Sequence, residues 1–272
     1  MTEFTFMEPT ANAAAEKFLR DGYVIQPAEN MDALDAIRTC AAESAAAALG
    51  TDVGDDVGTF LNDFHTHVGV DDLNRVRLAA IDGLNRQPWL RAAYFALARD
   101  AVYAVVGNEL AMQRRVNLSI QLPDDQSSIL PVHADVWSGD SPYEIVLWVP
   151  LVDCHDTKSM YLMPPEPDRA VQANMGADFR GSSEEDLFAA IKDDVQWMNV
   201  PYGNVLVFSQ TLMHGNRVNE ERETRWSMNC RFKSLFSPYA DKRLGEFFEP
   251  ITMRPATEMA LAYDLPKGFD RD

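Results

Sequence analysis

Apolar positions recur at helical spacing through the first 110 residues. Three segments, around Ala11–Leu19, Met31–Leu49 and Arg75–Val106, are rich in Ala and Leu, and their apolar side chains share one face of a helix. We therefore predict helices there. The short stretch GYVIQP, residues 22–27, lies between the first two segments and predicts a strand.

From Gln113 onward the pattern changes to short β-rich runs separated by Pro, Gly and Asp, which is typical of an antiparallel sandwich or barrel. Polar and apolar side chains alternate in Arg115–Leu122 and in Thr224–Phe232, whereas Tyr143–Val149 is almost wholly apolar and predicts a strand buried on both sides. One face of the first two runs is polar, with Asn117, Ser119 and Gln121 on the first and Arg225, Ser227, Asn229 and Arg231 on the second. The predicted fold class is mainly β with flanking α-helices.

The chain of 272 residues contains no repeat, low-complexity tract or Pro/Ser-rich linker, so we predict a single domain over residues 1–272. Within it, residues 1–110 form a mostly helical part, residues 111–236 a β core, and residues 237–272 a C-terminal extension. The extension, with Phe247, Phe248 and Met259, either covers the mouth of the barrel or contacts a second copy in a homodimer.

A net charge of −18 argues against nucleic acid and anionic membrane surfaces as partners, because no run of Lys and Arg reverses the charge locally. No apolar stretch approaches the roughly 18 residues that a membrane-spanning helix needs. The start of the chain lacks the features of a secretory signal, which predicts a cytoplasmic location. Cys40, Cys154 and Cys230 lack CxxC spacing and suit reduced thiols.

Two histidines and an aspartate have the types and order of a metal site. His133 and Asp135 lie two residues apart in LPVHADVW, so an extended strand would put both side chains on one face, roughly 7 Å apart. His214 follows an apolar run in VLVFSQTLMHGNR and offers a third ligand. Two imidazoles and one carboxylate that leave the remaining positions open form the facial triad of non-haem iron(II) oxygenases.

Arg225 strengthens this interpretation. It lies 225 − 214 = 11 residues after the second histidine, on the polar face of the next predicted strand. A guanidinium there can form a bidentate, charge-assisted bond to the far carboxylate of 2-oxoglutarate, whose other end can chelate the metal while dioxygen takes the last position.

Four segments carry a resemblance to a known family: FLRDGYVIQP, GNELAMQRRVNLSIQLP, PVHADVWSGDSPYEIVLWVPLVDC and MHGNRVNEERETRWSMNCRFKSLF. Between about Phe18 and Tyr239 the chain resembles the phytanoyl-CoA dioxygenase-like superfamily of iron(II)/2-oxoglutarate oxygenases. It is more closely similar to bacterial members from carbohydrate and secondary-metabolite gene clusters. The resemblance implies a double-stranded β-helix, a cupin-like jelly roll, that uses Fe(II), 2-oxoglutarate and dioxygen.

The resemblance carries over residue by residue. His133, Asp135 and His214 fall on the iron positions, and Arg225 falls on the co-substrate position. Trp148 resembles an aromatic residue that lines the 2-oxoglutarate pocket in some relatives. Because some relatives that halogenate have Gly or Ala in place of the aspartate, the intact Asp135 favours hydroxylation or another oxidation.

Further candidates for pocket contacts come from the polar strand faces and from one loop. They are Asn117, Ser119, Gln121, Thr157, Ser227, Asn229 and Arg231, and a solvent-facing or structural role stays open for the strand residues. Trp137 and Tyr143 either wall the entrance or belong to the core. His65 and His67, in NDFHTHVGV, either bind metal or line the pocket, or they are structural, whereas His155, beside Asp156, is expected to be a loop residue.

The sequence therefore predicts a dioxygenase of secondary metabolism that hydroxylates an unactivated C–H bond of a small polar metabolite, such as a sugar, nucleotide sugar or aminoglycoside-like compound. Three alternatives stay open: a hydroxylase of a free or derivatised amino acid, a non-catalytic binding protein on the same scaffold, and a cupin-like metalloenzyme for which Arg225 is dispensable. An acyl-CoA fits less well, because its phosphates would meet a chain of net charge −18.

Overall fold

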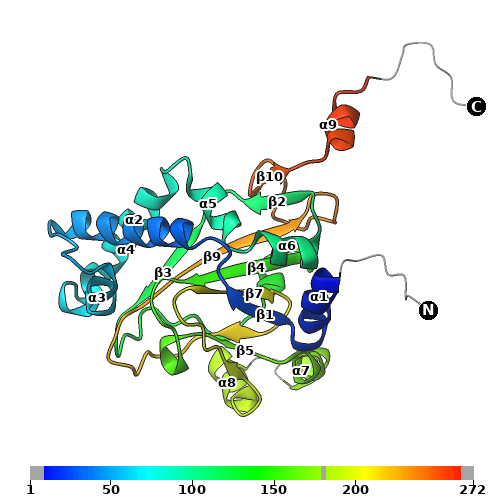
Figure 1. Cartoon of the computed structure of the whole chain (residues 1–272). Helices are drawn as coiled ribbons and strands as arrows, with labels where there is room; N and C mark the ends of the chain where they lie inside the picture. The colour runs from blue at the N-terminus through cyan, green and yellow to red at the C-terminus, as the bar shows by residue number, and fades with distance from the viewer. Residues whose placement is uncertain (1–8, 179–181, 265–272) are drawn as a thin grey trace, which may run out of the picture.

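Two antiparallel sheets form the centre of the computed structural model, which describes residues 9–178 and 182–264 (Figure 1). The larger sheet has the strand order β1-β7-β4-β9-β2-β10, with β3 also paired to β9, and the smaller sheet has the order β6-β5-β8. The strands of the larger sheet are β1 (Tyr23–Pro27), β2 (Leu110–Gln113), β3 (Asn117–Gln121), β4 (Glu144–Pro150), β7 (Asn204–Ser209), β9 (Arg225–Ser234) and β10 (Phe248–Thr252). Those of the smaller sheet are β5 (Tyr161–Leu162), β6 (Gln196–Trp197) and β8 (His214–Gly215).

Helices surround these sheets, and most of them precede β2 in the chain (Figure 1). They are α1 (Pro9–Asp21), α2 (Met31–Leu49), α3 (Val57–Asn62), α4 (Val70–Asn85), α5 (Leu90–Ala96), α6 (Arg99–Val106), α7 (Pro165–Asp178), α8 (Glu184–Ile191) and α9 (Pro255–Leu261). Three 3-10 turns, η1 (Phe64–Thr66), η2 (Asp135–Ser138) and η3 (Asp156–Lys158), lie in the loops. Among the described residues, no helix is long and apolar enough to cross a membrane.

Local capping explains why α2 has its predicted bounds. The Asn30 side chain accepts a hydrogen bond from the Ala33 amide at the N-terminus, and Gly50 ends the helix in the left-handed conformation, with φ of 70°. The segment Arg75–Val106, which was predicted to be helical, is divided among three helices. That segment forms α4, α5 and α6, and the first break contains Pro88, which lacks an amide hydrogen and cannot continue a helix.

The alternation in β9 separates two environments. Trp226 contacts Phe64 edge to face, with ring centroids 4.8 Å apart, and Phe232 packs against Phe95 of α5, so this face of the strand joins the helical layer. The opposite face, which carries Arg225 and Arg231, borders a cavity that His214 and Gly215 of the smaller sheet also line. The strands predicted around β1, β3, β4 and β9 are all present.

Two regions differ from the pattern expected from sequence. Helices α7 and α8 interrupt residues 111–236, which were expected to form a β core, because both are inserted between β5 and β6. The C-terminal extension contributes β10, which pairs with β2, before α9 extends away from the sheets (Figure 1).

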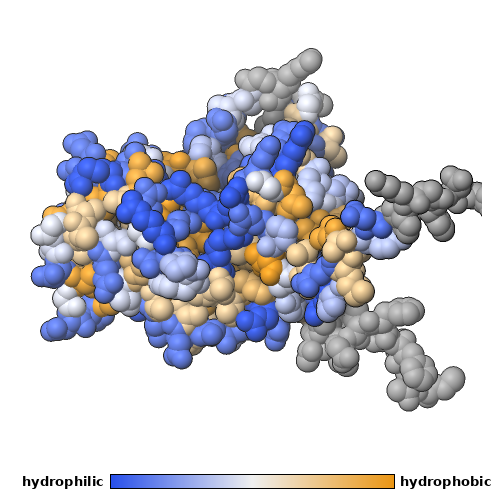
Figure 2. Space-filling model, turned by 90° about the horizontal axis from the view of Figure 1, so that it is seen from above, coloured by the Kyte–Doolittle hydropathy of each residue, from blue (hydrophilic) through white to orange (hydrophobic). Residues whose placement is uncertain are grey.

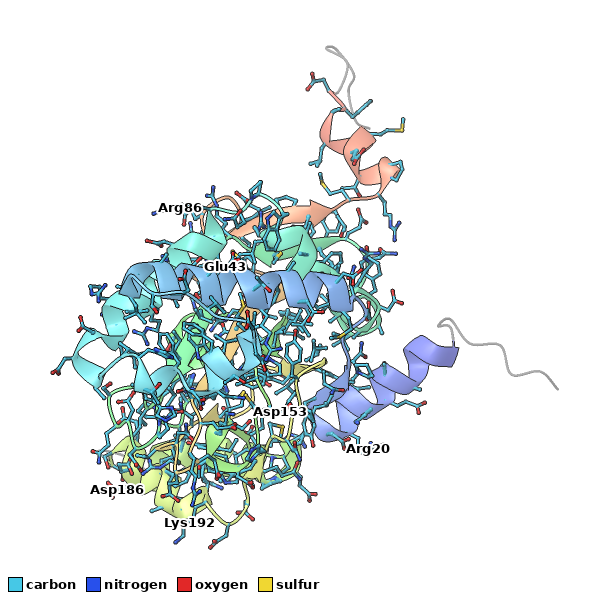
Figure 3. The ribbon with its side chains drawn as sticks, turned by 60° about the vertical axis from the view of Figure 1, so that its left-hand side comes forward. Arg20, Glu43, Arg86, Asp153, Asp186 and Lys192 are labelled. Atoms are coloured by element: carbon cyan, nitrogen blue, oxygen red, sulfur yellow. The ribbon has the colours of Figure 1, made fainter. Side chains whose placement is uncertain are left out.

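Most of the charged residues lie on the outer surface. From above, hydrophilic and hydrophobic residues are interspersed, with hydrophilic ones gathered near the centre of the view (Figure 2). The side-chain view labels charged residues that are all exposed, among them Glu43, Arg86 and Lys192 (Figure 3). The apolar core therefore lies between the sheet and the helices.

Tyr94 offers a test of the contact between the helices and the sheet. Its fully buried hydroxyl donates to the Leu147 carbonyl of β4 at 2.9 Å. We expect Tyr94→Phe to lower the free energy of unfolding by about 1 kcal/mol, because one buried hydrogen bond is lost. Urea denaturation measures the change, with Tyr263→Phe, at a residue that is 65% exposed, as the matched control. Equal stabilities of the two variants would contradict this role.

Candidate metal centre

The backbones of His133 and His214 pair directly with one another. The His133 amide donates to the His214 carbonyl at 2.9 Å, and the His214 amide donates to the His133 carbonyl at 2.8 Å. This antiparallel bridge brings the two side chains to neighbouring positions, with ring centroids 4.3 Å apart. Two histidines far apart in the chain therefore face one point.

Each imidazole is oriented by its own backbone. Nδ1 of His133 donates to the Pro131 carbonyl and Nδ1 of His214 donates to the Leu212 carbonyl, both at 2.8 Å. Nε2 of each ring is then free to bind a metal. Burial lowers the pKa of His214 to about 4, so its ring is neutral at neutral pH, as a ligand must be.

Asp135 completes the set of candidate ligands. Its Oδ1 lies 3.5 Å from Nε2 of His133 and 4.0 Å from Nε2 of His214. Metal bonds of about 2.0–2.2 Å place adjacent ligands roughly 3 Å apart, so a small inward movement would let all three atoms hold one ion. The predicted extended strand is wrong at this point: Asp135 begins the 3-10 turn η2, although its side chain still converges with the histidines.

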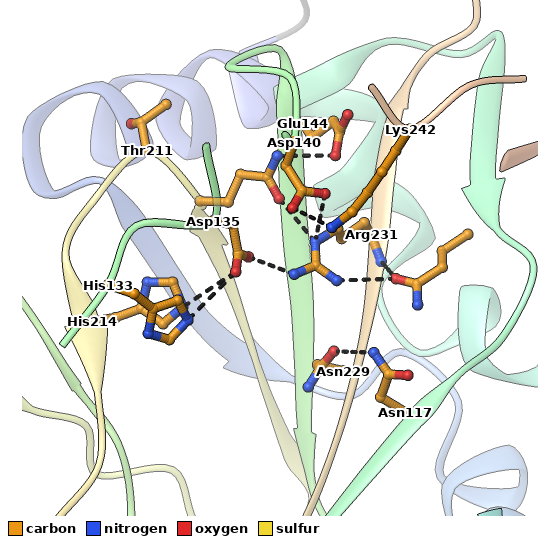
Figure 4. Close-up of polar contacts among 12 residues, drawn as sticks. Asn117, His133, Asp135, Asp140, Glu144, Thr211, His214, Asn229, Arg231 and Lys242 are labelled. Carbon is orange, nitrogen blue, oxygen red and sulfur yellow. Dashed lines mark hydrogen bonds and ion pairs between the residues drawn. The ribbon is translucent and has the colours of Figure 1, made fainter. Parts of the chain in front are cut away.

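Arg231 of β9 holds the other oxygen of the aspartate (Figure 4). Its Nη2 lies 2.9 Å from Asp135 Oδ2, which leaves Oδ1 directed at the histidines. Burial raises the pKa of the Asp135 carboxyl, but the contacts with His133, His214 and Arg231 outweigh burial and hold that pKa well below its usual range. The carboxylate is therefore ionised, with Oδ2 bound by Arg231 and Oδ1 facing the histidines.

Asp135, Arg231 and the two histidines border a cavity of about 390 Å³ between the two sheets. At the far end of β9 from Arg231, the guanidinium of Arg225 is buried, with Nη1 donating to the Ser159 carbonyl at 2.9 Å and Nη2 donating to Ser119 Oγ at 3.1 Å. Within residues 9–178 and 182–264, its Nε has no hydrogen-bond partner and no carboxylate forms an ion pair with it. Burial lowers the pKa of Arg225 to about 10, so the group remains a desolvated cation that lacks an anion.

The structure brings most of the candidate residues to this cavity. Its lining includes Asn117, Ser119, Trp148, Ser227, Asn229 and Arg231 together with the three candidate metal ligands and Arg225. Gln121 and Thr157 are not among the lining residues. Gln121 donates to the Arg217 carbonyl at 2.7 Å and accepts from Asn216, whereas Thr157 contacts the loop residues Glu220 and Glu221.

The remaining candidates lie elsewhere. His65 contacts the Thr224 hydroxyl at 3.2 Å, and the exposed His67 lies beside Phe60 with ring centroids 5.2 Å apart, so neither lines the cavity. Trp137 and Tyr143 are exposed and also absent from the lining. His155 lies with Asp156 and Glu221 in a second, largely exposed group whose donor atoms are close enough to share an ion.

Sequence reasoning missed the supporting charges around Arg231. Gln210 accepts from Arg231 Nε at 3.1 Å and donates to Glu144 at 2.9 Å, while Asp140 and Lys242 continue the network (Figure 4). The one local signal was that two acids, Asp140 and Glu144, lie just before and at the first position of an otherwise apolar strand. Apolar residues of the cavity wall, such as Leu130, Met160 and Phe208, could not be distinguished from ordinary core residues in the sequence.

Glu144 generates a pH prediction. Burial raises the pKa of its carboxyl to about 7 from the ordinary 4.5. As pH rises from 4.5 to 7, the unfolded chain loses this proton before the folded protein does, so the wild type loses stability across that window. We expect the stability of Glu144→Gln, measured by urea denaturation relative to the wild type, to increase through the same window and level off above it. A pH-independent difference, like that expected for the exposed control Glu43→Gln, would contradict the assignment.

Comparisons with known proteins agree with this architecture. No family model matches the chain, and neither does any curated protein. Among solved structures, the chain is similar to a non-haem monooxygenase, the ThoJ–Ni complex, with a TM-score of 0.52 and 19% identity over 89% of this chain and 84% of that chain. It is similar to EctD from S. alaskensis, with a TM-score of 0.57 and 17% identity over 87% and 81% of the two chains.

A third similar structure is SnoK, a non-haem, α-ketoglutarate-dependent carbocyclase from nogalamycin biosynthesis. The TM-score is 0.53 and the identity 13%, over 91% of this chain and 97% of that chain. At these identities the comparisons establish the fold. They confirm the prediction that the chain adopts the cupin-like jelly roll of non-haem 2-oxoglutarate oxygenases.

Proposed function

We propose that this protein is an Fe(II)- and 2-oxoglutarate-dependent dioxygenase that hydroxylates an unactivated C–H bond of a small polar metabolite in a biosynthetic pathway. The observation that carries the proposal is that one cavity contains both a His-Asp-His ligand set and Arg225, a buried cation for which the described residues supply no anionic partner. A metal site alone would not require that arginine.

The ligand set fits iron(II). Two imidazole nitrogens and one carboxylate oxygen, all within 4.8 Å of one another, lie beside an open cavity and leave the rest of a coordination sphere for exogenous ligands. Iron(II) held there would supply the oxidising chemistry by which dioxygen and 2-oxoglutarate yield succinate, carbon dioxide and a hydroxylated product. The carboxylate of Asp135 occupies the position at which a halide would have to bind, which favours hydroxylation over halogenation.

Arg225 fits the distal carboxylate of 2-oxoglutarate. Two of its nitrogens are fixed by neutral oxygens, so its plane is oriented before any ligand arrives. A carboxylate in the cavity would offset the cost of burying this charge through charge-assisted hydrogen bonds. Ser227 and Trp148, on the same stretch of the cavity wall, would flank the co-substrate.

Other lining residues shape the reaction space. Val146, Met160 and Phe208 form an apolar wall that keeps water away from the reacting bond. Asn117 Nδ2 donates to Asn229 Oδ1 at 3.0 Å, and the remaining side-chain amide groups of this pair are suited to hydroxyl or amide groups of a substrate.

Charge narrows the choice of substrate. Among the residues that line the cavity, Asp135 is the only acid, and it is already engaged by Arg231. No carboxylate there can pair with an ammonium group. A neutral sugar or a nucleotide sugar therefore fits better than an aminoglycoside-like compound or a free amino acid, whereas an N-acylated amino acid lacks the conflicting charge. The volume, near the lower end for ligand pockets and shared with the co-substrate, favours a small reacting group.

Arg225→Met tests the co-substrate. We expect the concentration of 2-oxoglutarate required for half-maximal succinate formation to rise about 100-fold, because a charge-assisted pair is lost. Binding of Co(II) should persist, and folding stability should not fall, since an unpaired buried cation is replaced by an apolar side chain of similar volume. Arg86→Met, at an exposed site, serves as the control. An unchanged 2-oxoglutarate requirement would favour a cupin-like enzyme that works without this co-substrate.

A matched set of compounds tests the substrate class. Glucose, N-acetylglucosamine, glucuronate and glucosamine differ mainly in one charged or neutral substituent, and further sugars and amino acids can be grouped in the same way. We expect succinate release coupled to a mass gain of one oxygen to occur with neutral or anionic members of such sets. Coupling that occurs only with the amines would refute the charge argument while leaving the dioxygenase assignment intact.

A further inference from the structure

The segment between β9 and β10 packs directly on the loop that carries Asp135. Pro238 accepts a hydrogen bond from Ser141 Oγ at 2.7 Å, and the Asp241 amide donates to the Gly139 carbonyl at 3.1 Å. Gly139 has φ of 85°, and a Cβ atom there would lie 2.6 Å from Asp241 Oδ2. This close approach requires glycine and places Lys242 beside Asp140.

Four side chains of alternating charge then run from this segment to the metal ligands (Figure 4). Lys242 forms an ion pair with Asp140 Oδ2, Asp140 Oδ1 lies 3.2 Å from Arg231 Nε, and Arg231 Nη2 lies 2.9 Å from Asp135 Oδ2. The side chain of Asp140 is 1% exposed, so water contributes little to its stabilisation. Its charge depends on the two cations beside it.

The guanidinium of Arg231 forms ion pairs with two acids, Asp135 and Asp140. Its Nε–H donates to Gln210 Oε1 at 3.1 Å, so the nearby Asp140 Oδ1, which accepts no hydrogen bond from the described residues, attracts Arg231 through charge alone. Lys242 neutralises part of that attraction. Without Lys242, the uncompensated Asp140 would draw the guanidinium away from Asp135.

We infer that Lys242, from outside the barrel, is a positioning residue for the metal-binding carboxylate. Acting through Asp140 and Arg231, it keeps Oδ2 of Asp135 engaged and thereby leaves a single oxygen, Oδ1, for the metal. The segment between β9 and β10 is thus a supporting part of the metal centre. This inference rests on the metal site of the proposed function.

Co(II) titration of the purified full-length protein tests the inference without catalysis. We expect Lys242→Met to lower the affinity for Co(II) by at least about 10-fold, the usual effect of losing a supporting partner, and to change the visible d–d spectrum of the bound ion. Lys242→Arg should restore both. Lys192→Met removes the same charge from the exposed end of α8 and should leave both unchanged.

A double variant separates positioning from general damage. Asp140→Asn removes the charge that Lys242 neutralises, so Lys242→Met combined with Asp140→Asn should bind Co(II) more tightly than Lys242→Met alone. Wild-type affinity and spectrum in Lys242→Met, or strictly additive effects in the double variant, would overturn the positioning role. Neither result would contradict the proposed metal site itself. Failure of the wild type to bind Co(II) would refute both the site and the inference.

Discussion

The whole site depends on one short backbone pairing. Two hydrogen bonds between His133 and His214 join the loop before β4 to strand β8 of the smaller sheet, and they set the separation of the two imidazoles before any metal is present. Because hydrogen bonds from Nδ1 to nearby carbonyls also fix both rings, the two imidazole nitrogens that face the site are held by the backbone rather than by flexible side chains. Preorganisation of this kind lowers the entropy that binding would otherwise lose.

The two arginines on the inner face of β9 show how one strand serves two purposes. Arg231 is surrounded by Asp135, Asp140 and two glutamine oxygens, so its charge is compensated within the protein. Arg225, six residues earlier on the same face, has only neutral hydrogen-bond partners in the part of the chain that the structure describes. Leaving a buried cation uncompensated costs stability, and proteins tolerate such a cost mainly where a ligand relieves it.

The charge of the cavity differs in sign from the charge of the molecule. The chain carries a net charge of −18, yet two arginines and a single acid border the cavity. An anion is therefore attracted by the local field once it has passed the surface, where exposed charges are screened by salt over about 10 Å. Overall charge is a poor guide to the ligands of this protein, because burial makes the few nearest charges dominate.

From the types and order of its residues and a family resemblance, the sequence indicated the four residues proposed to bind metal and co-substrate. By itself it also determined the features that follow from local periodicity: the polar face of β9, the nearly wholly apolar β4 and the bounds of α2. These follow from the alternation of side chains along a strand and from helix capping, which act over a few residues. Only the tertiary structure decided that Arg231 engages Asp135, that Gln121 and Thr157 turn to other partners, and that a lysine beyond β9 reaches Asp140. Such contacts join distant segments whose approach is set by packing of the sheets and loops, for which no local pattern exists.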